Sequence, residues 1–193
     1  MEKNLVEERF LNSIHIKNEM MRDEETLVTI KKLAEEISRV IKKGGKILTC
    51  GNGGSASDSL HIVGELMGRF QKDRNGYSAI ALNADVATMT AIANDYGYDE
   101  VFSRQVEGLM KEGDIVLGIS TSGNSSNVIK AFERAKELGG KTALLSGNDG
   151  GILKDLADYK IVVPSDVTAR IQECHMLVYH ILCEIVEDKL TSE

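Results

Sequence analysis

A glycine-rich turn at residues 51–55 constrains the fold of this chain more than any other stretch. The mostly apolar residues 46–50 before it predict a short buried strand, which the glycines end abruptly. Ser55 is suited to cap a following helix over residues 56–70. A strand, a glycine turn and a helix in this order direct backbone N–H groups and a helix dipole at an anion. A tight turn without a ligand is the alternative, and the turn alone does not separate the two.

Two known phosphate-binding motifs can be compared with this turn. It lacks the Gly-Lys-Ser/Thr of a P-loop and contains no Lys or Arg, so N–H groups and hydroxyls would have to bind any phosphate. Gly51, Gly53 and Ala56 fit a loose dinucleotide fingerprint, which requires an acidic residue about 20 positions further on. The nearest candidate, Asp85, comes later than this spacing, so a dinucleotide site is the weaker alternative.

Strands and helices alternate along the rest of the chain. The expected strands are 46–50, 77–82, 114–120, 141–146 and 160–163, and the expected helices between and after them are 56–70, 84–92, 99–110, 126–138, 153–157 and 168–190. Two more helices, 4–22 and 23–43, precede the first strand. Such repeated units predict an α/β fold, a three-layer, doubly wound parallel sheet to which the two leading helices are an addition. We expect a single domain over residues 1–193, with the leading helices in 1–44 and the α/β core in 45–193.

Composition argues against several classes of protein. The 193 residues carry a net charge of −7 and no long basic block, which argues against nucleic acid as a partner. Residues 1–10 lack the apolar core of a signal peptide, and no run is long enough to span a membrane. Cys50, Cys174 and Cys183 lack zinc-binding spacing, and we expect buried, reduced thiols in a cytoplasmic protein without a membrane partner.

A second polar loop follows the third expected strand. Residues 120–126 contain four serines and one threonine, together with a glycine and an asparagine. A polar turn capped by Ser125 or Ser126 is one interpretation, but a cap needs only one of these five hydroxyls. In a parallel sheet this loop would lie near the glycine turn, because ligands bind beyond the carboxyl ends of the strands. A cluster of hydroxyls beside a helix N-terminus favours a phosphate monoester as ligand.

Two helices carry the candidate titratable groups. His61 and Glu65 are four residues apart and share one face of the helix after the glycine turn, although a solvated surface pair is the alternative. Gln172 and His180 are eight apart on the last helix, which places them about 80° apart on the helical wheel. That helix is apolar nearly all round, which indicates burial or a subunit contact, and His175 is interpreted as structural.

Five segments together resemble a known family, the phosphoheptose isomerases of the sugar isomerase (SIS) fold. They are CGNGGS at 50–55, ELMGR at 65–69, NDYG at 94–97, GISTSGNS at 118–125 and ARIQECH at 169–175, followed by His180. The serine loop alone indicates only the SIS fold, whereas Glu65, Gln172 and His180 together are more specific. The resemblance covers nearly the whole chain and implies the flavodoxin-like form of the α/β fold.

The resemblance implies a cytoplasmic homotetramer that converts sedoheptulose 7-phosphate to D-glycero-D-manno-heptose 7-phosphate, a precursor of ADP-heptose for lipopolysaccharide or surface glycan. It places the substrate on Asn52, Gly53, Gly54, Ser55, Asn94, Asp95, Ser120, Thr121, Ser122, Ser125 and Gln172. It implies one Zn²⁺ per subunit, held by His61, Glu65, Gln172 and His180. Ala56, Ser57 and Ala169 vary among family members and bear on substrate preference.

An aldose–ketose isomerase must move a proton between neighbouring carbons through an enediol. The resemblance implies that Glu65 is the base and His180 the acid. A carboxylate bound to zinc is a poorer base, so the two roles of Glu65 conflict and the sequence leaves them open. The alternatives are a non-catalytic SIS protein that binds the replication initiator DnaA, and a sugar-phosphate sensor. The DnaA-binding relative lacks Glu65 and His180, and this chain has both.

Overall fold

The centre of the computed structural model is a sheet of five strands in which every neighbouring pair is parallel. The strands are β1 (Ile47–Gly51), β2 (Ala79–Ala81), β3 (Ile115–Ser120), β4 (Lys141–Ser146) and β5 (Tyr159–Val162), in the order β2-β1-β3-β4-β5. This is the flavodoxin-like order, with its switch point between β1 and β3. The structure describes residues 4–192, so the ends of the expected 1–193 domain, residues 1–3 and 193, lie outside it.

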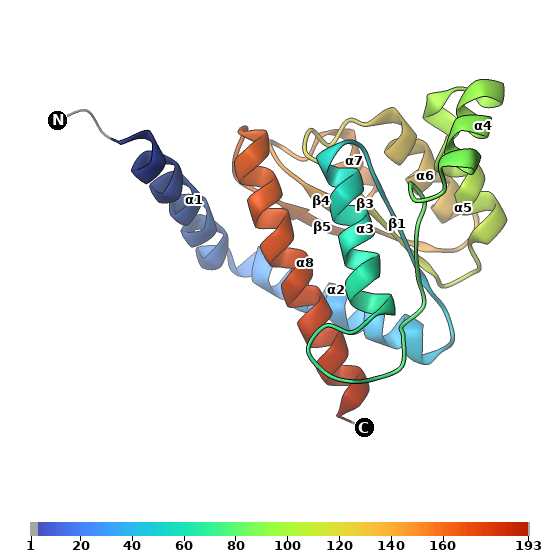
Figure 1. Ribbon diagram of the computed structural model, residues 1–193, viewed down its shortest axis with the longest axis horizontal. Coiled ribbons are helices and arrows are strands. Elements are labelled where there is room, and N and C mark those ends of the chain that lie inside the picture. Colours follow the sequence, from blue (N-terminus) through green and yellow to red (C-terminus); the bar gives the residue numbers. More distant parts are fainter. Residues whose placement is uncertain (1–3, 193) are drawn as a thin grey trace.

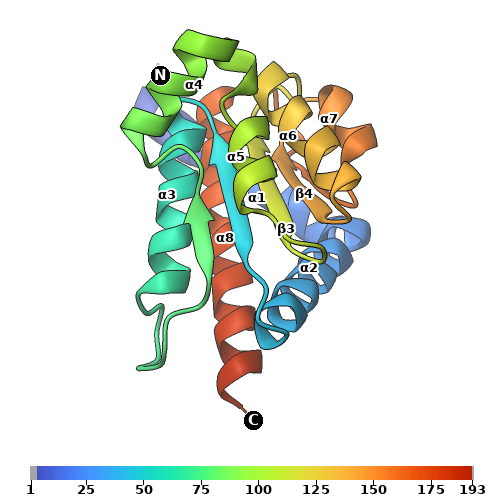
Figure 2. The same cartoon turned by 90° about the vertical axis from the view of Figure 1, so that its right-hand side faces the viewer.

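Helices cover both faces of the sheet (Figure 1). Those on one face are α1 (Leu5–Arg22), α2 (Glu24–Lys42), α3 (Gly54–Met67) and α8 (Thr168–Thr191). Those on the other face are α4 (Val86–Tyr96), α5 (Ser103–Leu109), α6 (Ser126–Glu137) and α7 (Gly151–Leu156). Figure 2 shows α3 and α8 side by side, and Figure 1 shows α1 extending away from the body. The predicted three-layer α/β fold is confirmed.

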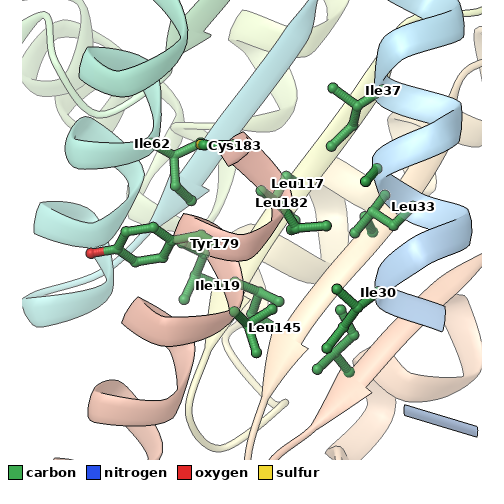
Figure 3. Close-up of a cluster of buried hydrophobic side chains, with 14 of the residues drawn as sticks. Ile30, Leu33, Ile37, Ile62, Leu117, Ile119, Leu145, Tyr179, Leu182 and Cys183 are labelled. Atoms are coloured by element: carbon green, nitrogen blue, oxygen red, sulfur yellow. The ribbon is translucent and has the colours of Figure 1, made fainter. Parts of the chain in front are cut away.

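The core has two halves because side chains of each strand alternate between the faces of the sheet. Ile115, Leu117 and Ile119 of β3 pack towards α2 and α8, whereas Val116 packs towards α5 and α6. Burying each such side chain contributes about 1.5–3 kcal/mol. Figure 3 shows part of the first half, including Ile30, Leu33, Ile37, Ile62, Leu117, Ile119, Leu145, Tyr179, Leu182 and Cys183. The alignment of α3 and α8 over the sheet depends on this packing.

Several helix boundaries differ from the expected ones, and glycines account for two of the differences. Helix α4 continues past residue 92 to Tyr96 and stops at Gly97, whose φ of 94° a helix does not allow. The expected helix 99–110 is therefore divided into a 3₁₀ turn, Tyr98–Glu100, and α5. The expected cap Ser55 is wrong, because α3 begins at Gly54 and its N-cap is Gly53, with φ 57°. Ser55 lies buried within the first turn.

The described residues also bear on three smaller expectations. Cys50, Cys174 and Cys183 are buried free thiols, and burial raises the pKa of Cys50 to about 12. Asp85, the candidate acid of a dinucleotide site, caps α4 by accepting from the N–H groups of Ala87 and Thr88. Within residues 4–192, no helix combines the length and the apolar character that crossing a membrane requires.

Candidate active site

The glycine loop and the serine loop lie at the same edge of the sheet, beyond its switch point. β1 and β3 are neighbours, with Gly51 opposite Ile119, so the loops that follow these strands leave the sheet together. At the glycine loop, the N–H groups of Ser55 and Ala56 donate to the carbonyls of Asn52 and Gly53 at 3.0 Å. The turn therefore offers an anion fewer free donors than the sequence pattern indicates.

Gln172 of α8 closes the glycine loop from one side. A Cβ added to Gly54 would lie 2.2 Å from the Gln172 Nε2 atom, so a glycine is needed for this close approach. The contact joins the start of α3 to α8 and places the Gln172 amide at the loop. The expectation that Gln172 contacts the substrate is compatible with this position.

Asn52 makes a reciprocal amide pair that links the two loops. Its Nδ2 donates to Asn127 Oδ1 and its Oδ1 accepts from Asn127 Nδ2, both at 2.9 Å. The Tyr98 hydroxyl also donates to Asn52 Oδ1, at 3.0 Å. The side chain of this expected substrate ligand is thus engaged with protein groups. Sequence reasoning missed Asn127 and Tyr98, although Asn127 directly follows the serine loop and Tyr98 directly follows the NDYG segment.

In the serine loop the hydroxyls are not used to cap the helix. Ser125 is the N-cap residue of α6, but its side chain makes no capping hydrogen bond and instead shares one of 2.9 Å with the Ser120 hydroxyl. The Ser122 hydroxyl accepts from the N–H of Asn124 at 3.2 Å. Two residues of the loop after β4 also contact the serine loop: the N–H of Gly147 and Nδ2 of Asn148 donate to the Thr121 carbonyl. The loop is thus held by contacts to its backbone and by these internal bonds, and its hydroxyls retain hydrogen-bonding capacity for a ligand because each can both donate and accept.

Asn94 and Asp95 lie in the last turn of α4 and are exposed. Asn94 Nδ2 donates to Asp95 Oδ1 at 2.8 Å, so these expected substrate ligands pair with each other. The hydrogen bond between Tyr98 and Asn52 ties the segment that follows them to the glycine loop.

His61, Glu65 and His180 converge from two helices. His61 Nε2 lies 2.9 Å from Glu65 Oε1 on α3 and 3.5 Å from His180 Nε2 on α8. One possible ligand atom from each residue falls within 4.8 Å of the others. The His61–Glu65 pair is therefore not isolated, because His180, 119 positions further along the chain, joins it, although the two side chains are 40% and 22% exposed. By the rise of an α-helix, this cluster lies about 10 Å along α3 from Gly54.

The donor set of this cluster suits a metal ion. Two imidazole nitrogens and a carboxylate oxygen form the ligand type that open zinc sites use, with room for further ligands. Three atoms bearing lone pairs so close together also require a proton or a cation between them. The implied fourth ligand, Gln172, is not brought to this cluster, because its amide lies at Gly54, about 10 Å along α3 from His61.

Behind the cluster lie Tyr179 and Asp58. His61 Nδ1 and the Tyr179 hydroxyl are 2.9 Å apart, and this hydroxyl donates to Asp58 Oδ1 at 3.4 Å. Burial raises the pKa of Asp58, while the hydrogen bond from Tyr179 opposes the shift. Burial also raises the pKa of Tyr179, which keeps it a neutral hydroxyl. Sequence reasoning missed both residues, since Tyr179 looks like one more core residue of an apolar helix.

Comparison with known proteins identifies the family. The SIS domain profile matches residues 9–147. A phosphoheptose isomerase of Helicobacter pylori (strain HPAG1) is 59% identical over 147 residues, which are 76% of this chain and 77% of the relative. One of Clostridium acetobutylicum is 44% identical over 191 residues, 99% of this chain and 97% of the relative. The structure of phosphoheptose isomerase from Neisseria gonorrhoeae superimposes with a TM-score of 0.89 at 40% identity, covering 95% of this chain and 97% of the other. The chain belongs to the phosphoheptose isomerases.

In this phosphoheptose isomerase family member, Arg74 and Glu187 support the end of α3 that carries Glu65. Arg74 donates from Nη2 to the Glu65 carbonyl at 2.8 Å and from Nη1 to the Leu66 carbonyl at 2.9 Å. Its Nε donates to Glu187 Oε1 at 2.9 Å. Glu187 also accepts from the N–H groups of residues 70–72, which fastens the loop after α3 to α8. Nothing in the sequence pointed to this pair, because both residues lie in polar stretches.

His175 has the structural role expected of it. Its side chain is fully buried, and its Nε2 lies 3.0 Å from the Ser146 carbonyl. Burial lowers the pKa of His175 to about 4, with the hydrogen bond to Ser146 opposing the shift. The ring therefore stays neutral near physiological pH, and it packs the start of α8 against the end of β4.

Proposed function

We propose that this chain interconverts sedoheptulose 7-phosphate and D-glycero-D-manno-heptose 7-phosphate, and so supplies heptose for ADP-heptose and lipopolysaccharide or another surface glycan. The observation that carries the proposal is the His61–Glu65–His180 cluster, in a chain 44% identical to a phosphoheptose isomerase over 191 residues. A DnaA-binding or sensory SIS protein has no need for an acid–base pair. The enzyme is therefore favoured over both alternatives.

The two ends of the substrate suit the two halves of the site. Its phosphate is on C7, whereas the reaction takes place at C1 and C2, at the other end of the molecule. We assign the phosphate to the hydroxyls of Ser120, Thr121, Ser122 and Ser125, and the sugar hydroxyls to residues 52–55, Asn94, Asp95 and Gln172. The Asn52 side chain is paired with Asn127, so Asn52 would contact the substrate through its backbone, while the amide pair holds the loop in position.

The reaction requires one group that removes a carbon-bound proton and another that moves a proton between two oxygens. Glu65 takes the proton from C1 of the ketose and returns it to C2, and His180 transfers the proton between O1 and O2. General acid–base groups of this kind contribute about 10²–10⁴-fold each. His61 Nε2 lies 2.9 Å from Glu65 Oε1 and holds the carboxylate in place through the proton or cation between them.

We further propose one Zn²⁺ per subunit, held by His61, Glu65 and His180. The Gln172 amide lies at Gly54, about 10 Å along α3 from this cluster, so we leave the remaining coordination position open. When bound, such an ion polarises a substrate carbonyl and organises the site. The convergence of three donor atoms within 4.8 Å supports this assignment. A metal-bound carboxylate is a poorer base, so Glu65 serves either as the base or as a ligand at any one moment.

Exposed apolar side chains on α1 and α8 support the proposal of a homotetramer, which we place in the cytoplasm. Leu5, Val6, Phe10, Leu11 and Ile14 of α1 are each more than half exposed. Met176 and Leu177 on α8 are 44% exposed. Patches of this kind on a soluble chain mark protein–protein contacts. Light scattering at micromolar concentration should give four times the mass of the chain, and the mass of a single chain would contradict the assembly.

Glu65→Gln tests the catalytic assignment, because it keeps the shape of the side chain and removes the basic carboxylate. We expect a loss of about 10²–10⁴-fold in kcat with sedoheptulose 7-phosphate, and unchanged folding and assembly. Glu133→Gln, on the exposed surface of α6, is the matched control and should retain full activity. Full turnover by Glu65→Gln would refute the mechanism. A wild-type protein that binds the sugar phosphate but never converts it, with Zn²⁺ supplied, would favour the binding-protein alternative.

A further inference from the structure

A chain of three polar side chains runs from the His61–Glu65–His180 cluster into the interior. His61 Nδ1 contacts the Tyr179 hydroxyl at 2.9 Å, and this hydroxyl contacts Asp58 Oδ1 at 3.4 Å. Tyr179 is fully buried and Asp58 is 7% exposed. The second carboxylate oxygen of Asp58, Oδ2, has no hydrogen-bond partner among residues 4–192. The Tyr179 hydroxyl is thus the donor that the structure provides for a buried carboxylate.

The direction of these hydrogen bonds determines which nitrogen of His61 is free. A tyrosine hydroxyl has one proton and a carboxylate accepts only, so Tyr179 donates to Asp58. The hydroxyl oxygen can then accept, and the proton it accepts comes from Nδ1 of His61. A neutral imidazole carries one proton, so His61 Nε2 keeps its lone pair. That lone pair faces Glu65 Oε1 at 2.9 Å and His180 Nε2 at 3.5 Å.

We propose that Tyr179 and Asp58 are positioning residues that fix the tautomer and the orientation of His61, so that its Nε2 is directed at a metal ion in the cluster. The inference rests on the metal site proposed above. Histidines that bind metals generally donate their second N–H to a protein acceptor, which fixes the ring and raises its basicity as a ligand. Here that acceptor is a tyrosine whose own proton is held by a carboxylate.

Packing alone does not require the hydroxyl of Tyr179. The ring lies in the hydrophobic cluster with Ile62 and Cys183, and a phenylalanine would fill the same space. Figure 3 shows the Tyr179 oxygen at the end of the ring that points away from the other labelled side chains. The rings of His61 and His180 both meet Tyr179 edge to face, with centroids 5.3 and 4.9 Å away. The hydroxyl therefore extends from the core to the back of the metal-binding cluster.

The test compares Tyr179→Phe with Tyr77→Phe in the full-length protein. Tyr77 is the matched control, because its hydroxyl is buried without a hydrogen-bond partner among the described residues. Zn²⁺ affinity is measured by competition with a chromophoric chelator. We expect Tyr179→Phe to bind Zn²⁺ about 10–100-fold more weakly than wild type, and Tyr77→Phe to bind it equally well. Asp58→Asn keeps an acceptor oxygen and loses the charge. Its affinity for Zn²⁺ should therefore fall between those of Tyr179→Phe and Tyr77→Phe.

A second readout needs neither metal nor activity. Long-range ¹H–¹⁵N NMR of ¹⁵N-histidine-labelled protein identifies the tautomer of each imidazole. Nδ1 of His61 should carry a proton in the metal-free wild type, whether or not the Glu65 carboxylate also draws a proton onto Nε2, and Tyr179→Phe should lose this preference. Equal Zn²⁺ affinity of Tyr179→Phe and Tyr77→Phe would overturn the inference, and so would a wild-type His61 that carries a proton on Nε2 and none on Nδ1. A wild type that shows the Nδ1 tautomer but binds no Zn²⁺ would overturn the metal site and leave the positioning of His61 supported.

Discussion

Replacing Arg74 by methionine should destabilise the protein strongly, because Arg74 is the cation that pairs with a buried carboxylate. Arg74 and Glu187 form an ion pair at 2.9 Å, with side-chain exposures of 6% and 2%. Methionine keeps much of the apolar stem and removes the guanidinium. Glu187 would then remain buried with only the N–H groups of residues 70–72, and the Glu65 and Leu66 carbonyls would lose a donor.

The magnitude follows from the burial of this pair. Removing one partner of a buried ion pair costs about 3–5 kcal/mol. In a domain of this size each kcal/mol shifts the melting temperature by roughly 2–4 °C, so Arg74→Met should lower Tm by about 6–20 °C. Thermal unfolding followed by circular dichroism at neutral pH measures the shift. Hydrogen exchange should show the greatest loss of protection at the end of α3, where Glu65 lies.

Lys72→Met is the matched control, since it removes a cation from the same loop. Lys72 pairs with Asp188 at 2.6 Å, but both side chains are exposed, so little change in Tm is expected. A decrease for Arg74→Met no larger than that for Lys72→Met would refute the reasoning.

The pH dependence adds a second test. Burial alone would raise the pKa of Glu187, but the N–H donors and Arg74 outweigh it and lower the pKa. The contribution of Glu187 to stability is therefore present above its unfolded pKa and is lost as the pH falls through the lowered folded pKa. Because Arg74→Met raises that folded pKa, the difference in Tm between wild type and variant should narrow in acid.

Two further predictions concern His175 and Gly123. Because the pKa of buried His175 is lowered to about 4, the unfolded chain binds a proton first, and stability should fall by roughly 3 kcal/mol as the pH drops from 6.5 towards 4. In a plot of the urea midpoint of unfolding against pH, His175→Gln should flatten the region between pH 6.5 and 4. His15→Gln, at an exposed residue, should leave this region unchanged. An unchanged profile for His175→Gln would contradict the assignment. Gly123 has φ 67°, and an added Cβ would lie 1.9 Å from the Gly150 carbonyl oxygen, so Gly123→Ala should displace the serine loop and raise KM for the sugar phosphate. Gly108→Ala, where a Cβ meets nothing within 4 Å, is its control, and equal KM values for the two variants would argue against a phosphate site in this loop.

The sequence by itself was sufficient for the layout of the fold and for the two loops of the site. Buried strands such as Ile115–Ser120 are continuous apolar runs, and the glycine and serine turns follow them directly. Their placement at one edge follows from the parallel order, because every such strand ends at the same side of the sheet. These are local patterns combined with one general rule of topology, so no side-chain contact has to be known.

Two of the errors in the predicted helix boundaries occurred at glycines. Gly53 and Gly97 adopt positive φ, which moved the start of α3 and divided the segment after α4. A pattern of apolar residues does not show where the backbone will use this freedom, since glycine accepts either sign of φ at little cost.

Only the tertiary structure decided which side chains meet. His61 and His180 are 119 residues apart, and Asn52 and Asn127 are 75 apart. Whether such pairs touch depends on the rotation and axial offset of two helices, which the packing of the whole core sets to within an ångström or so. The spacing of Glu65 or Gln172 along its own helix does not contain this information. For the same reason Tyr179, Asp58, Arg74 and Glu187 looked like ordinary core or surface residues until α3 and α8 were placed against each other.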